Sequence, residues 1–191
     1  MKRFFFVVLV VLILASCETK PKGERLVLDY LQQNTNGLDC SIIKISSPDS
    51  LYSPFELINS LILTKTRTCA DLTKQLVDAY DKPTLKERRA AALEVAKLAD
   101  AEYNNRDDFV DIVNAITNPS IVDKPANRIA YTATYKVQGA IKEDVFFLER
   151  DGSAVGHTAS ELEDSYLKLC DVNGKLFVLK RDAEETVRTI R

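Results

Sequence analysis

The hydrophobic period of this chain changes near Pro125, and this change restricts the fold more than any other feature. From Phe55 to Tyr80, apolar side chains recur at the 100° per residue of an amphipathic helix. From Ile129 to Gln138, apolar and polar residues alternate, which is the period of a half-buried strand. Helices followed by meandering strands predict an α+β fold, with three main helices packed on one face of an antiparallel sheet of three to four strands.

Capping signals mark where two of these helices are expected to begin. Ser53 and Glu56 form a capping-box pattern in front of the long helix, and Thr84 and Glu87 form a second one in front of the next helix. The β-branched residues between Thr64 and Thr68 weaken helix propensity, so this stretch is a candidate interruption of the long helix.

The C-terminal part of the chain is expected to return to the sheet. Ser160 and Glu163 form a third capping-box pattern, in front of a short helix. Asn173-Gly174 is a favourable hairpin turn, and Lys175 to Arg181 is the expected closing strand of the sheet.

A leader precedes all of these elements. Lys2 and Arg3 form a positive start, and Phe4 to Leu14 is a run of 11 apolar residues, too short to span a bilayer. The sequence Leu14-Ala15-Ser16-Cys17 resembles the lipobox of bacterial lipoproteins. This resemblance implies cleavage in front of Cys17 and acylation of its thiol. Two or three acyl chains anchor a protein stably to a membrane.

The leader divides the chain into expected parts. We expect a signal peptide over residues 1–16, a lipidated tether over 17–23, one α+β domain over 24–181 and a charged tail over 182–191. Glu18 follows the lipid site in place of the aspartate that retains enterobacterial lipoproteins in the inner membrane. The expected location is therefore the cell envelope, on the outer membrane, with the periplasmic and surface faces both open.

Two further segments carry a resemblance. The loop Pro48-Asp49-Ser50-Leu51-Tyr52-Ser53 and the segment from Lys142 to Gly156 are similar to parts of small uncharacterised lipoproteins of the Bacteroidota type. That group has no assigned activity, so the resemblance implies no catalytic residues. The order of helices and sheet is also similar to NTF2-like and cystatin-like domains, which makes a cone-shaped sheet the alternative architecture.

Charge and motifs exclude several functional classes. The net charge of −2 provides no surplus for binding phosphate backbones, so nucleic acid is not an expected partner. The hydrophobic fraction of 46% falls to about 43% beyond the leader, which is typical of soluble folds. The chain has no P-loop, GxGxxG, GxSxG or HExxH pattern. We therefore predict no catalytic residues, no cofactor and no metal site.

Three cysteines remain after lipidation of Cys17. In an oxidising compartment, one pair among Cys40, Cys69 and Cys170 forms a disulfide, or all three stay as inert thiols; the sequence does not choose the pair. No CxxC spacing supports a redox site.

Two other kinds of side chain are candidate site residues. His157 is the single histidine; it lies near an expected turn and is interpreted as a surface loop residue. Tyr131 and Tyr135 share one face of the clearest strand. They either fill the core between sheet and helices or line a pocket for a small ligand.

These observations favour a non-enzymatic, membrane-anchored module that binds or scaffolds an unidentified envelope component. The alternative is an NTF2-like domain that binds or hydrolyses a small ligand in a pocket between helices and sheet. The second hypothesis requires a cavity that contains Tyr131 or Tyr135.

Overall fold

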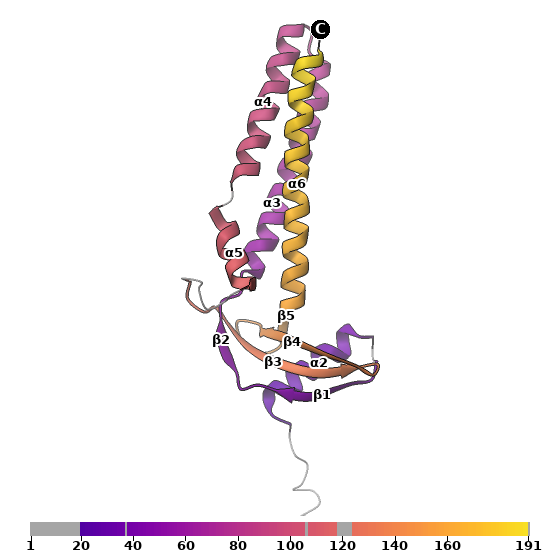
Figure 1. Ribbon diagram of the computed structural model, residues 1–191, viewed down its shortest axis with the longest axis vertical. Helices are drawn as coiled ribbons and strands as arrows, with labels where there is room; N and C mark the ends of the chain where they lie inside the picture. Colours follow the sequence, from indigo (N-terminus) through magenta and orange to yellow (C-terminus); the bar gives the residue numbers. More distant parts are fainter. Residues whose placement is uncertain (1–19, 37, 106, 118–123, 191) are drawn as a thin grey trace, which may run out of the picture.

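The structure, a computed structural model, describes residues 20–36, 38–105, 107–117 and 124–190. These residues form an α+β fold with five helices and an open, antiparallel, five-stranded sheet, which confirms the predicted class (Figure 1). The expected signal peptide and the lipidation site Cys17 lie outside the described residues. In chain order the elements are α2 (Lys22–Asn34), β1 (Cys40–Ile45), β2 (Asp49–Leu51), α3 (Phe55–Tyr80), α4 (Leu85–Asn104), α5 (Asp107–Thr117), β3 (Arg128–Val137), β4 (Ala140–Leu148), β5 (Val155–Thr158) and α6 (Ala159–Thr189).

Strand β3 is the centre of the sheet. It pairs with β4 on one side and with both β1 and β2 on the other, and β5 pairs with the far edge of β4. The sheet has five strands, whereas three to four were expected. The three-residue β2 is the strand that the sequence did not predict. The turn between β3 and β4 consists of Gln138 and Gly139, with φ of 49° and 84°. Two consecutive positive φ angles define the turn type that fits the twist of a tight hairpin.

The three longest helices form a bundle that extends away from the sheet (Figure 1). Helix α3 is continuous through Thr64–Thr68, so the expected interruption is absent. The Thr84 capping box forms as predicted and starts α4. The core of the bundle is formed by apolar residues of α3, α4 and α6: Leu72, Val95, Ala96, Ala99, Leu176, Leu179 and Ala183. The alanines among them let the helices approach closely.

Helix α6 departs most from the sequence-based expectation. It runs unbroken for 31 residues, so Lys175–Arg181 is helical rather than a strand, and the segment expected as a charged tail is helical up to Thr189. All but one of its buried residues recur in steps of three and four, the spacing of a coiled-coil seam: Leu162, Ser165, Leu169, Val172, Leu176, Leu179, Ala183 and Thr186. The exception is Asn173, which is buried beside this seam.

Energetics explain why the Asn173-Gly174 pair does not break this helix. A glycine in a helix interior costs about 1 kcal/mol relative to alanine. Full burial of one leucine contributes about 2 kcal/mol. Leu169 and Leu176, on either side of the pair, are both fully buried, so continuation of the helix outweighs the local turn preference.

Helix α2 and the start of α6 contact the sheet directly. Val27 and Leu31 of α2 pack against Ala133, Tyr135 and Phe146 on one face of the sheet. Helix α6 begins immediately after β5, where the side chain of Thr158 and that of Glu161 form the capping box, in place of the expected Ser160–Glu163 pair. The base of the bundle has its own core of Ile58, Ile112, Leu162 and Leu169.

A buried ion pair connects α3 to α4. Lys65 is 1% exposed, and its Nζ lies 2.6 Å from the backbone oxygen of Glu102 and 3.1 Å from its Oε1. A buried ammonium requires such partners, because taking a charge out of water costs several kcal/mol.

We therefore expect substitutions of the two partners to change the free energy of unfolding by different amounts. Glu102→Ala should lower the free energy of unfolding by about 2 kcal/mol, because the Lys65 charge stays buried without its carboxylate. Lys65→Met should change it by less than about 1 kcal/mol, because methionine keeps the packing and removes the charge. Urea denaturation measures both, with the exposed Lys97→Met as the control. Equal losses in the two variants would contradict this account.

Candidate functional site

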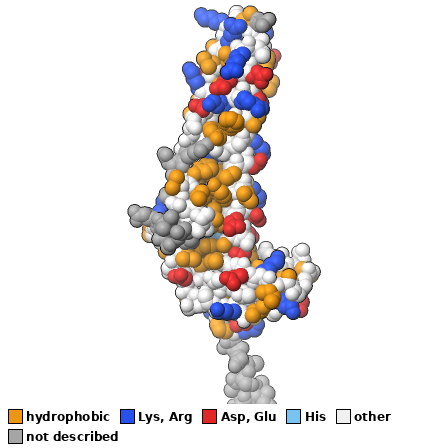
Figure 2. Space-filling view, in the orientation of Figure 1, with side chains coloured by type: hydrophobic (Ala, Val, Ile, Leu, Met, Phe, Trp, Pro, Cys, Tyr) orange, Lys and Arg blue, Asp and Glu red, His pale blue; other side chains and the backbone are white. Residues whose placement is uncertain are grey.

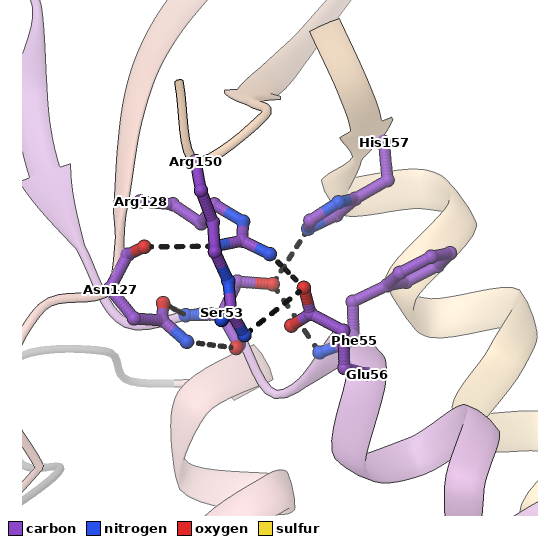
Figure 3. Close-up of polar contacts among 7 residues, drawn as sticks. All are labelled: Ser53, Phe55, Glu56, Asn127, Arg128, Arg150 and His157. Carbon is purple, nitrogen blue, oxygen red and sulfur yellow. Dashed lines mark hydrogen bonds and ion pairs between the residues drawn. The ribbon is translucent and has the colours of Figure 1, made fainter. Parts of the chain in front are cut away.

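A cluster of polar side chains lies where the bundle joins the sheet (Figure 3). Its central contact is between Ser53 Oγ, just in front of α3, and His157 Nε2 in β5, at 2.6 Å. Both side chains are buried, with exposures of 1% and 3%. The prediction of His157 as a surface loop residue is therefore wrong, because β5 carries it into the junction with the bundle.

The His157 ring is held between two aromatic rings. It stacks on Phe55 of α3 at a centroid distance of 4.2 Å, and on Phe147 of β4 at 4.9 Å. Burial lowers the pKa of His157 to about 4; the positive charge of Arg128 adds to this shift and Glu161 opposes it. The imidazole is therefore neutral at physiological pH.

The residues around this pair complete the junction. Asn127 accepts a hydrogen bond from Ser53 N at 2.8 Å and donates one to Ser53 O at 2.9 Å. The buried Arg128 donates to the carboxylate of Glu56, and the exposed Arg150 lies 3.9 Å from the same carboxylate. The expected capping box of Ser53 and Glu56 does not form, because both side chains are used in these long-range contacts.

A serine next to a histidine has the composition of a nucleophile and its base, but this pair is enclosed. Both faces of the imidazole are covered by phenyl rings, and Ser53 is buried. The adjacent cavity, of about 210 Å³, is lined by Asn127, Arg128 and Arg150 among others, and not by Ser53 or His157. This geometry holds the bundle to the sheet and offers a substrate no access to the serine.

A second polar region is open to solvent and is a better binding site. It is a cleft of about 470 Å³ between α2, strands β3 and β4, and the start of α6. Aromatic side chains form its apolar part: the Phe146 ring lies edge-on to Tyr30 at 5.9 Å and to Tyr135 at 5.7 Å. Polar groups surround them, including Asn34, Thr35, Lys142, Glu143, Asp144, Ser160 and Glu161.

The two tyrosines singled out from the sequence have different positions. Tyr135 lines the cleft, whereas Tyr131 does not. The Tyr131 ring instead packs so closely on α2 that a Cβ at Gly23 would lie 2.5 Å from it. Tyr30 and Glu161 were not identified from the sequence, since nothing local relates two residues that far apart.

Burial and the neighbouring carboxylates together keep the tyrosines of the cleft protonated. Burial raises the pKa of the Tyr30 phenol, and its hydrogen bond to Glu161, with the charges of Glu161 and Asp144, raises it further. Burial also raises the pKa of Tyr135, with contributions from Asp144 and Cys40. Both phenols therefore stay protonated and act as hydrogen-bond donors.

The carboxylates of the cleft are fixed by backbone groups. Asp144 Oδ1 accepts from the backbone N–H of Val145 at 2.8 Å and of Ser160 at 3.3 Å. Glu161 Oε2 accepts from the N–H of Thr158 at 2.8 Å. Each carboxylate has further lone pairs available for a ligand.

The cysteines do not form the disulfide that the sequence allowed. Cys40, Cys69 and Cys170 are all free thiols on three different elements. Cys69 lines a groove of about 720 Å³ between α3 and α6, and Cys170 lines a cleft on the α5 side of α6. Among the described side chains, no group of three or more histidine, cysteine, aspartate or glutamate residues is placed to hold a metal ion.

Comparisons of the chain with protein-family models, with curated proteins and with solved structures gave no match.

The buried His157 predicts a pH dependence of stability. Its pKa is 6.5 in the unfolded chain and about 4 in the fold, so the unfolded state binds the proton more readily. Stability from this group is complete above pH 6.5 and is lost as the pH falls toward 4, by about 3 kcal/mol in total.

The matched variant is His157→Phe, which keeps a ring between Phe55 and Phe147 and does not titrate. We expect a smaller loss of unfolding free energy in this variant than in the wild type when urea denaturation is repeated across that pH range. Identical pH profiles would show that His157 is not buried in its neutral form.

Proposed function

We propose that this protein is a lipid-anchored, non-enzymatic binding protein of the bacterial cell envelope, and that the cleft between α2 and the sheet binds a compact organic cation. The observation that carries the proposal is the negative, aromatic-lined cleft at Tyr30, Tyr135 and Phe146. Its volume of about 470 Å³ lies within the range of small-molecule sites.

Charge and aromatic content favour a cation over other small ligands. Glu143, Asp144 and Glu161 line the cleft against one lysine, Lys142, so the formal charges sum to a negative value. Burial is the main cause of the raised pKa of Tyr30, and the charges of Glu161 and Asp144 that add to it also attract a cation. The faces of tyrosine and phenylalanine rings attract cations as well, most strongly when both groups are desolvated.

The lipobox-like leader supports the anchor, as does the resemblance to Bacteroidota-type lipoproteins. Helix α2 begins at Lys22, shortly after Cys17, and lies on the sheet at the opposite end of the molecule from the tip of the bundle (Figure 1). A lipid at Cys17 therefore places the sheet and its cleft near the membrane and directs the bundle away from it.

The bundle is long, and its described helices are not membrane-spanning. Helix α6 alone extends about 46 Å at 1.5 Å per residue. None of the described helices is long and apolar enough to cross a bilayer.

The cleft proposal is tested by titrating the full chain in mild detergent with putrescine and with tetramethylammonium, followed by calorimetry. We expect both cations to bind, and acetate and glucose not to bind. Glu161→Gln should weaken cation binding about tenfold, because it removes a charge and keeps most of the helix cap. Added salt should weaken binding in the wild type.

Glu163→Gln is the matched control, because it makes the same change of charge on an exposed residue of α6 that does not line the cleft. It should leave the affinity for both cations unchanged. Equal weakening by the two variants, or equal binding of acetate, would refute a specific cation site.

The anchor is tested separately by labelling cells with palmitate. The wild-type chain should incorporate the label and lose residues 1–16, as shown by the mass of its N-terminal peptide. Cys17→Ser should lose the label, and Cys40→Ser should retain it. Label retained in Cys17→Ser would exclude this lipid site.

A further inference from the structure

A second cleft, of different chemical character, lies on the bundle. It has a volume of about 530 Å³ and is bounded by the end of α4, by α5 and by α6. In Figure 2 apolar side chains gather over the middle of the bundle, where α5 meets α6. Most of the lining is apolar or aromatic: Tyr103, Phe109, Val110, Val113, Tyr166 and Cys170. None of the described lining residues carries a formal charge, which separates this cleft from the acidic one near the sheet.

Asn173 of α6 lines this cleft and has an unusual state. The residue is 7% exposed, and its Oδ1 accepts no hydrogen bond. Among the described side chains it is the one buried polar atom without a partner. Burying such an acceptor unpaired has a desolvation cost, and the great majority of buried polar atoms avoid it by forming a hydrogen bond.

The neighbouring side chains do not relieve this cost. The hydroxyl of Tyr166 is engaged with Cys170, one turn before Asn173. The Tyr103 ring packs against Phe177, with centroids 5.4 Å apart. Asn173 is buried beside the three-and-four seam of α6, one position after Val172.

We propose that this cleft binds a neutral, compact aromatic molecule with one hydrogen-bond donor, such as an indole or a phenol, and that the donor bonds to Asn173 Oδ1. The ring would lie against Phe109, Tyr103 and Tyr166, and the volume is sufficient for one or two fused rings. The χ2 torsion of asparagine is broad, so the amide can adjust to a donor bound in the cleft. This site is independent of the proposed cation cleft.

The test compares two probes of nearly the same shape with the full chain in mild detergent. Indole has an N–H donor, whereas benzothiophene has none. We expect Asn173→Leu to weaken indole binding about tenfold and to leave benzothiophene binding unchanged or stronger. Asn114→Leu, a similar change on α5 in the same cleft, should affect both probes alike. Putrescine binding should not change in either variant.

A second measurement needs no variant in the cleft. Cys170 lines the site and is exposed, so bound indole should slow its modification by a maleimide, while Cys40 reacts at an unchanged rate. The proposal is overturned if neither indole nor phenol protects Cys170 at its solubility limit. It is also overturned if Asn173→Leu, folded as judged by its unfolding midpoint, changes the affinity for indole and benzothiophene equally.

Discussion

The continuous apolar seam of α6 is the constraint on which the rest of the structure depends. Its buried side chains recur in steps of three and four, so one narrow stripe of the helix faces its neighbours along the whole bundle. The lower part of the stripe packs with α3 and α5, and the upper part packs with α3 and α4. If α6 ended at Gly174, as its local sequence suggests, the upper core would lose Leu176, Leu179 and Ala183.

The junction between bundle and sheet depends on polar contacts that hydrophobic burial alone does not specify. Ser53 and His157 are 104 residues apart in the chain, and Glu56 and Arg128 are 72 apart. Each contact connects the start of α3 to a strand, so together they determine the angle at which the bundle leaves the sheet. The buried, neutral His157 and the paired Arg128 are stable only as members of this cluster, because either group unpaired would have a large desolvation cost.

The architecture separates two clefts with different chemistry. The cleft near the sheet forms where the N-terminus of α6 meets α2 and β4. Glu161 lies in the first turn of α6, where negative charge is favourable, and Asp144 of β4 accepts from the Ser160 N–H of the same turn. The cleft on the bundle lies between α5 and α6, where side chains follow apolar stripes, so its lining is largely neutral. In a lipid-anchored molecule the first would lie near the membrane and the second farther from it.

Much of the fold follows from the sequence alone, because local periodicity is enough to define it. The alternation from Ile129 predicted β3, the 100° stripe from Phe55 predicted α3, and the Thr84 capping box predicted the start of α4. The α+β class followed from the order of these elements. The candidate sites were predicted only in part: Tyr135 lines the cleft, but the carboxylates of the cleft, Asp144 and Glu161, are brought there by the packing of β4 and α6.

Other features were decided by the tertiary structure alone. In each of them, the local preference of the chain competes with a distant contact of similar or greater energy. Asn173-Gly174 favours a turn locally, yet the burial of Leu169 and Leu176 keeps it helical. Ser53 and Glu56 favour a capping box locally, yet His157 and Arg128 engage both side chains. A helix cap and a turn are each worth about 1 kcal/mol, which the burial of one leucine exceeds. Arg128 is buried and requires the carboxylate of Glu56 as its partner, because an unpaired buried charge would cost more than the lost cap. The sequence thus determined the type of most elements, and their packing determined where α6 ends and which side chains meet.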